Sequence, residues 1–184
     1  PGVAKCVTGD AKVLMGDCTE RNIKEIVDHW LSVNEVKEVD DGEYADADFE
    51  VMTFTPRGRI EKGRAVRVWK RDSPRRLIRF TTEKGRTLTV TPTHPLFVQN
   101  AYFMAQRPAP KIVEGNYLAV VSDQAPEGKV CGYDRGFSWD QIVKREEVRR
   151  EEEFVYDIEV ADTHIFVANE IISHNSQILR YMSD

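Results

Sequence analysis

The stretch FVYDIEVADTHIFVANEIISHN, residues 154–175, contains three segments with the composition of β-strands, separated by polar residues. Apolar and acidic residues alternate through VYDIEV, while residues 165–167 and 171–172 are all β-branched or aromatic. Alternation with a period of two is typical of a half-buried strand, and short apolar runs between polar residues indicate further strands. The stretch therefore predicts β-structure, and it ends in the polar pair His174-Asn175.

Similar strand signals recur through most of the chain. Strand-like segments occupy residues 13–15, 49–55, 65–70, 76–81, 86–90 and 117–121, with a hairpin turn predicted at Glu83-Lys84-Gly85. One amphipathic helix is predicted in NIKEIVDHWLSV, residues 22–33. We expect a loop over the acidic residues 34–48, exposed turns over 99–110 and 122–135, and a solvated strand or hairpin over 144–153. Many short strands with turns between them predict an all-β, or mainly β, fold.

Composition places the chain among ordinary globular proteins. Of its 184 residues 41% are hydrophobic and 31% charged, and the net charge of −5 argues against nucleic acid or an anionic membrane as the main partner. No apolar run approaches the roughly 20 residues that span a bilayer. Three cysteines favour a reducing, cytoplasmic setting in which at least one thiol is free. Cys18 and Cys131 are expected to take no part in function, and a bond between Cys6 and another cysteine stays open.

The two ends of the chain differ from the rest. Residues 1–5 read PGVAK, and residues 176–184 read SQILRYMSD and look helical. Joined, they give PGVAKSQILRYMSD, which resembles the phosphate-binding loop and following helix of minichromosome maintenance (MCM) replicative helicases. The resemblance implies that residues 6–175 interrupt a helicase. In the joined host, Lys5 would bind nucleotide phosphate and Ser176 magnesium, and ATP and DNA would be the host's partners.

The interrupting segment begins with Cys6 and ends with His174-Asn175, directly before Ser176. Together with the blocks CVTGDAKVLM, LTVTPTHPLFV and residues 154–175, these ends resemble an intein, a self-splicing element of the Hedgehog/intein family. The resemblance implies an all-β horseshoe with one or two short helices, acting as a monomer on its own flanking sequences (exteins) without cofactor or metal. It divides the chain into residues 1–5, 6–175 and 176–184 as N-terminal extein, intein and C-terminal extein.

The resemblance assigns the first chemical step to three residues. The Cys6 thiol would attack the carbonyl of Lys5, converting the peptide bond into a thioester. His94 would donate a proton to the departing nitrogen, and Thr91 would orient the scissile peptide. These residue types suit the chemistry, because a thiolate is a strong nucleophile and a histidine exchanges protons near neutral pH.

The second step would be attack of the Ser176 hydroxyl on the thioester, with Asp157 as its helper. Because VYDIEV alternates, Glu159 falls on the same face as Asp157, and the assignment to Asp157 is not unique.

In the third step Asn175 would cyclise and break its bond to Ser176. His174 would stabilise the developing charge or protonate the leaving amine, and His164 would serve as a base or proton relay. The product would be an unscarred bond between Lys5 and Ser176, which restores the helicase loop.

Three other functions compete with this interpretation. A cysteine hydrolase would use Cys6, His94 and Asp157 as a triad; a phosphate-loop ATPase fragment and a non-catalytic β-module are the others. Splicing could also be impaired or conditional on temperature, salt or redox state, giving cleavage at one end only. No pair of acidic decapeptides typical of homing endonucleases is present, so no endonuclease activity is expected.

Overall fold

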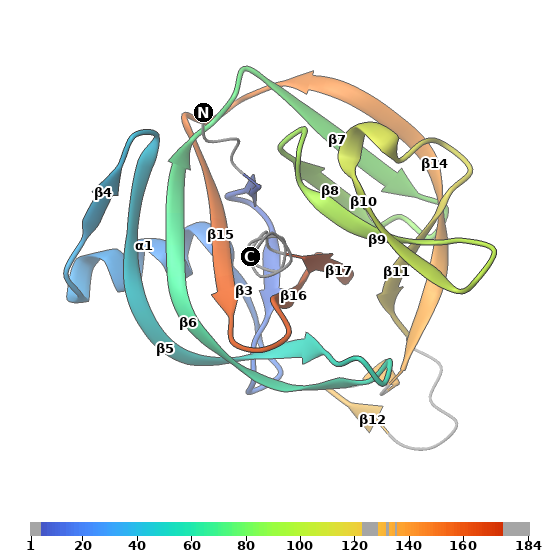
Figure 1. Ribbon diagram of the computed structural model, residues 1–184, viewed down its shortest axis with the longest axis horizontal. Helices are drawn as coiled ribbons and strands as arrows, with labels where there is room; N and C mark the ends of the chain where they lie inside the picture. The colour runs from blue at the N-terminus through green and yellow to red at the C-terminus, as the bar shows by residue number, and fades with distance from the viewer. Residues whose placement is uncertain (1–4, 123–128, 132, 135, 175–184) are drawn as a thin grey trace.

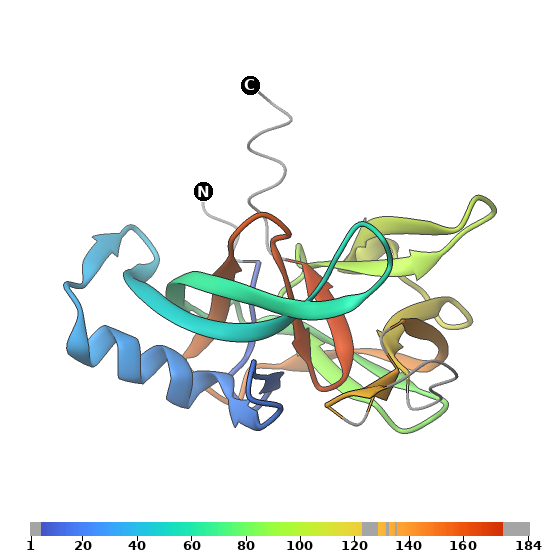
Figure 2. The same ribbon diagram turned by 90° about the horizontal axis from the view of Figure 1, so that it is seen from below.

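The computed structural model describes residues 5–122, 129–131, 133–134 and 136–174. Fifteen strands of this part of the chain form one continuous, strongly curved sheet. Figure 1 shows the long strands β5, β6 and β14 curving around the periphery, with β15, β16 and β17 nearer the centre. Seen edge-on, the molecule is flattened, with the helix at one end (Figure 2). The mainly β prediction is confirmed.

The strands are β1 (Val7–Thr8), β2 (Lys12–Leu14), β3 (Glu20–Asn22), β4 (Lys37–Val39), β5 (Gly42–Phe54), β6 (Ile60–Asp72), β7 (Arg76–Thr82), β8 (Thr87–Val90), β9 (Pro95–Gln99), β10 (Met104–Pro108), β11 (Tyr117–Val121), β12 (Lys129–Val130), β13 (Tyr133–Asp134), β14 (Phe137–Arg149), β15 (Phe154–Val160), β16 (Ile165–Ala168) and β17 (Ile171–His174). The main path runs β3-β2-β16-β17-β9-β11-β14-β7-β8-β1-β15-β6-β5-β4. Neighbouring strands pair antiparallel, and β12 pairs with β13 separately.

The loop predicted for residues 34–48 is wrong, because β4 and the first part of β5 lie there. Its acidic side chains face basic residues of β6 instead of only solvent. Asp46 lies 3.6 Å from Arg67, and Asp48 lies 3.1 Å from Arg64. Opposite charges on adjacent strands stabilise the pairing, and a reading of residues 34–48 alone could not include their partners on β6.

The predicted helix is present as α1 (Ile23–Val33), and a short 3₁₀ turn, η1 (Ala109–Lys111), follows β10. Asn22 caps α1 by accepting a hydrogen bond from the Lys24 N–H at 3.0 Å, which satisfies one free donor of the first turn. Ile23, Ile26 and Val27 are buried on one face, as their spacing predicts. No helix of the described residues is long and apolar enough to cross a membrane. The helix predicted within residues 176–184 lies outside the described residues.

Alternate residues of the inner strands face two different cores. On β11, Leu118 and Val120 pack in the larger core, whereas Ala119 and Val121 pack in the second. β17 behaves in the same way, with Ile171 in the larger core and Ile172 in the second. This alternation follows from the strand period of two and determines which way polar residues of the same strands point.

A buried ion pair joins elements far apart in the sequence. The Asp140 carboxylate on β14 accepts hydrogen bonds from Thr82 Oγ1 at 2.6 Å and Arg86 Nη1 at 2.8 Å. Arg86 also donates to the Val121 carbonyl at 3.2 Å and lies 3.1 Å from the Glu170 carboxylate. The Asp140 and Arg86 side chains are 1% and 11% exposed. The pair therefore holds the β7–β8 hairpin to β14, β11 and the β16–β17 turn.

Replacing Asp140 with alanine is expected to lower the free energy of unfolding by about 3–5 kcal/mol, because Arg86 keeps its buried charge and loses its main partner. Urea denaturation of a splicing-inactive precursor measures this. Asp48→Ala, which breaks an exposed pair, should change stability by no more than about 0.5 kcal/mol. Equal losses in the two variants would contradict a special role for the buried pair.

Candidate active site

Cys6 lies directly before β1, and β1 pairs with β8 on one side and β15 on the other. Val7 is opposite both Val90 and Tyr156, so the ends of these neighbouring strands bring Thr91 and Asp157 beside Cys6. The Cys6 side chain is 1% exposed. Burial raises its pKa well above the ordinary value for a thiol, and the Asp157 carboxyl, when ionised, raises it further. The thiol therefore stays protonated at neutral pH unless a base accepts its proton.

Thr91 holds the backbone of Cys6 from both sides. The Cys6 N–H donates to Thr91 Oγ1 at 3.1 Å, and the Thr91 N–H donates to the Cys6 carbonyl at 3.0 Å. The first of these groups belongs to the peptide unit between Lys5 and Cys6. The Thr91 side chain is fully buried, so this bond to the predicted scissile peptide is shielded from water.

His94 follows in the turn after β8, and its N–H donates to the Thr91 carbonyl at 3.0 Å. Its ring is fully buried. Burial lowers the pKa of His94 to about 3; an interaction with the Lys5 backbone opposes the shift, and the charges of His174 and Lys5 add to it. The ring is therefore neutral at pH 7 and near the carbonyl that Cys6 would attack. The structure brings Cys6, Thr91 and His94 together at the first junction.

Asp157 points to the same side of β15 as Val155, which packs against Cys6. The Asp157 carboxyl is 7% exposed, and its pKa is raised well above the ordinary value, mainly by burial and also by Glu159. Glu159 lies on the same face, as the alternation predicts, but is less buried. Asp157 contributes to the raised pKa of the Cys6 thiol, and Glu159 does not. The structure therefore favours Asp157 over Glu159 as the carboxyl of the site.

The two later histidines lie at the open end of the β16–β17 hairpin. Ile165 pairs with His174, and His164 directly precedes that pair. His174 is 1% exposed and packs edge-on against the Phe97 ring, with 5.7 Å between ring centroids. The His164 backbone has a positive φ of 60° and its N–H donates to the Val160 carbonyl at 3.1 Å. The predicted site residues Asn175 and Ser176 lie outside the described residues.

Ser173 is a buried polar residue of the site that the sequence reasoning missed. Its hydroxyl lies 2.6 Å from His94 Nε2, and both side chains are fully buried. The available signal was a serine inside the apolar run IISH, where a polar side chain needs a partner. That partner lies in a turn 79 residues earlier in the sequence, and no local pattern indicates a contact at that separation.

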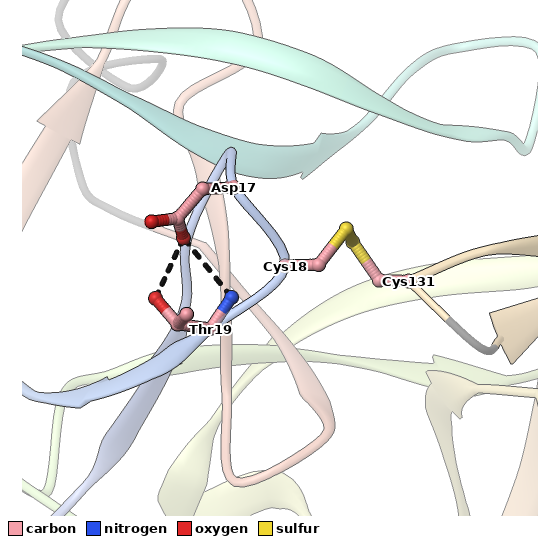
Figure 3. The surroundings of a disulfide bond; sticks show 4 residues. All are labelled: Asp17, Cys18, Thr19 and Cys131. Carbon is pink, nitrogen blue, oxygen red and sulfur yellow. Dashed lines mark hydrogen bonds between the residues drawn. A yellow bond between two sulfur atoms is a disulfide. The ribbon is translucent and has the colours of Figure 1, made fainter.

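The cysteines are arranged differently from the prediction. Cys18 and Cys131 are joined by a disulfide, with their Cα atoms 4.9 Å apart (Figure 3). Cys18 follows Asp17, whose carboxylate accepts two bonds from Thr19, at 3.0 Å from the N–H and 2.6 Å from the hydroxyl. These bonds lower the Asp17 pKa. The expectation of a reducing setting did not anticipate this bond, while the prediction that Cys18 and Cys131 take no part in function stays a prediction. Cys6 is free and forms no bond with either of them.

Comparisons with known proteins agree with this geometry. The family model of the intein splicing domain matches residues 13–175. The PabCDC21-1 intein structure is similar, with a TM-score of 0.83 and 32% identity, covering 94% of this chain and 99% of that one. The KlbA intein precursor from Methanococcus jannaschii shares the fold, with a TM-score of 0.81 and 24% identity over 97% of this chain and 95% of that one.

Two curated proteins also match part of the chain. The DNA polymerase II large subunit of Methanoculleus marisnigri is 31% identical over 67% of this chain, which spans 9% of that protein. The replication factor C small subunit of Pyrococcus horikoshii is 30% identical over 74% of this chain, which spans 16% of that protein. The chain thus corresponds to a small part of each relative's length. It belongs to the intein splicing domain family and carries out autocatalytic protein splicing, in which it cleaves the peptide bonds to its own flanking sequences and joins those sequences to each other.

Proposed function

We propose that splicing starts at the peptide bond between Lys5 and Cys6 and uses Thr91 and His94 as its catalytic groups. The observation that supports this most directly is that both side chains meet this one peptide unit. Thr91 Oγ1 accepts the Cys6 N–H at 3.1 Å, and the buried His94 ring interacts with the Lys5 backbone. The thiol of Cys6 adds to the Lys5 carbonyl, and the C–N bond breaks to leave a thioester and a free Cys6 amine.

Asp157 is proposed to act on the thioester. Its raised pKa favours the protonated carboxyl, which can donate a hydrogen bond to the thioester or to the departing sulfur, and its buried position beside Cys6 suits that task. The Ser176 hydroxyl attacks the thioester carbonyl and displaces the Cys6 thiolate, giving an ester. Glu159 is the second acidic group on this face and lies further from the thiol.

The last step is proposed to be cyclisation of Asn175. Its side-chain nitrogen attacks its own carbonyl, forming a succinimide and releasing the Ser176 amine. His174 and His164 lie at the hairpin end next to this junction, where either can exchange the required protons. The Ser176 ester then rearranges to an amide, which joins Lys5 to Ser176. The intein is then residues 6–175, and residues 1–5 and 176–184 are exteins.

A cysteine hydrolase is the alternative that the same three groups could form, since Cys6 and Asp157 are adjacent and His94 is close. Two observations favour splicing over it. The first is that the Cys6 thiol is 1% exposed and so presents almost no surface to a separate substrate. The N–H of Cys6 itself is held by Thr91, which places the catalytic groups on the chain's own peptide bond rather than on a separate substrate.

We further propose that the host is an MCM-type helicase, with its phosphate-binding loop interrupted between Lys5 and Ser176. The joined sequence PGVAKSQILRYMSD supports this. The unspliced host cannot place Lys5 on the nucleotide phosphates and Ser176 on magnesium at the same time. ATP hydrolysis and DNA unwinding would therefore wait for splicing. We also propose that the intein acts as a monomer in the cytoplasm.

A single time course tests splicing and its consequence for the host. A helicase precursor containing residues 6–175 is purified and followed by intact mass and by ATP hydrolysis, across temperature, salt and reductant. We expect excised intein, a ligated host with Ser176 directly after Lys5, and ATPase activity that rises in proportion to ligation. Activity of the unspliced Cys6→Ala, Asn175→Ala precursor, which keeps Lys5 and Ser176, equal to that of the ligated host would refute the proposed insertion site. Fragments cut at one junction only would refute coupled splicing under those conditions.

A further inference from the structure

The hydrogen bond between Ser173 and His94 connects the regions of the chain next to the two splice junctions. Ser173 lies on β17, two residues before Asn175, and His94 lies in the turn that reaches the Lys5–Cys6 peptide. The Oγ to Nε2 distance is 2.6 Å, and neither side chain is exposed. A buried bond of this length between side chains of β17 and of the turn between β8 and β9 leaves the imidazole little freedom to rotate.

Strand alternation explains why Ser173, and not its neighbour, meets His94. Ser173 pairs with Leu96 of β9, two residues after His94, and lies on the same face of β17 as Ile171. His174 is on the opposite face, where it packs against Phe97 in the second core. Ser173 and His174 therefore contact different neighbours. A shift of β17 by one residue would turn each side chain to the opposite face of the sheet.

The state of the other ring nitrogen matters for the chemistry. Among the described residues, Nδ1 of His94 is buried and makes no well-formed hydrogen bond, although the Lys5 backbone is near the ring. In a neutral imidazole one nitrogen carries the proton and the other is an acceptor. If Nε2 carries it, Nδ1 is the acceptor and can take a proton from a neighbouring group. If Nδ1 carries it, the ring cannot act as a base on that side.

We propose that Ser173 is a positioning residue that accepts a hydrogen bond from Nε2–H of His94 and so keeps Nδ1 free to move the proton of the first step. This rests on the proposed role of His94. Nδ1 takes the thiol proton as sulfur bonds to the Lys5 carbonyl carbon. It then returns that proton to the Cys6 nitrogen as the C–N bond breaks. His94 ends in its starting tautomer, so the step needs no external acid or base.

The kinetic test isolates the first step in an Asn175→Ala, Ser176→Ala precursor, where thioester formation is measured by cleavage with dithiothreitol or hydroxylamine. His94→Ala should slow this cleavage about 10²–10⁴-fold, the usual contribution of a positioned acid–base group. Ser173→Ala should slow it about 10–100-fold, and Ser173→Thr, which keeps the hydroxyl, should recover most of the rate. Ser73→Ala, which removes a hydroxyl that is 6% exposed and bonded to the Pro74 carbonyl, is the matched control and should leave the rate unchanged.

The outcomes separate the two claims. An unchanged rate in His94→Ala would overturn the proposed role of His94 and, with it, that of Ser173. A slow His94→Ala with an unchanged Ser173→Ala would overturn only the role of Ser173. A merely structural loss would slow Ser173→Ala and Ser73→Ala alike.

A spectroscopic measurement tests the tautomer directly and does not depend on rate. Nitrogen NMR of the same precursor with ¹⁵N-labelled histidine distinguishes a protonated ring nitrogen from a bare one. We expect His94 to show a protonated Nε2 and a bare Nδ1, and Ser173→Ala to lose this single pattern. A protonated Nδ1 in the parent protein, or an unchanged pattern in Ser173→Ala, would overturn the proposal.

Discussion

The Cys6→Ala precursor is expected to yield no ligated product at any temperature, salt concentration or redox state. A methyl group cannot bond to the Lys5 carbonyl, so no thioester forms and Ser176 has nothing to attack. Only the separate cyclisation of Asn175 remains, so the one fragment pattern expected is cleavage before Ser176. Intact mass spectrometry of the precursor, followed over time, measures both products at once.

Two controls make this result specific to the thiol. Cys6→Ser keeps a nucleophile of similar size, and its weaker hydroxyl should give slow cleavage at the first junction rather than none. Thermal unfolding of Cys6→Ala should show a folded protein, since the small cluster around Cys6 loses only a sulfur atom. Ligated product from folded Cys6→Ala would show that another nucleophile begins the reaction.

Much of the framework that holds Cys6 was predictable from local sequence. β11 and β15 span the predicted residues, 117–121 and 154–160, because both segments are rich in the β-branched and aromatic residues that favour strands. The hairpin turn before β8 is also confirmed, and Gly85 there has a positive φ of 89°, which glycine adopts without strain. Such features depend on residues close together in the chain. Thr91 and His94 were assigned to the first junction by resemblance. In the structure Thr91 Oγ1 accepts the Cys6 N–H and the His94 ring lies near the Lys5 backbone, while the roles of the two residues stay predictions.

What could not be predicted depends on contacts between distant residues. The acidic segment 34–48 looked like a loop because its partners, Arg64 and Arg67, are on another strand. Ser173 looked unremarkable beside His174 because its partner lies in a turn on the far side of the sequence. The separation of Cys18 and Cys131 is 113 residues, and no spacing rule pairs two cysteines that only the closed sheet brings together.

That disulfide gives the second large effect. Removing it, by Cys18→Ser or by reduction, is expected to lower the free energy of unfolding by up to about 4–5 kcal/mol, because the bond closes a loop of 113 residues in the unfolded chain. For a protein of this size, such a loss corresponds to a fall in melting temperature on the order of 10 °C. Calorimetry of a precursor inactivated by Cys6→Ala and Asn175→Ala, with and without reductant, measures it.

The design of this experiment separates the bond from the side chains. Cys18→Ser, Cys131→Ser and the double variant should melt at the same lowered temperature, because each removes the same bond and their effects cannot add. Reductant should lower the parent to that temperature and leave all three variants unchanged. Cys131 packs against the second core, and Cys6 lies in a separate cluster. Cys18→Ser in the Asn175→Ala, Ser176→Ala precursor, which keeps Cys6, should therefore leave the rate of thioester formation unchanged when it is measured with hydroxylamine well below the melting temperature. If reductant does not change the melting temperature of the parent precursor, and Cys18 and Cys131 titrate as free thiols, the bond does not form in solution. If reductant instead stops thioester formation in fully folded protein, the bond between Cys18 and Cys131 controls the position of Cys6 as well as stability.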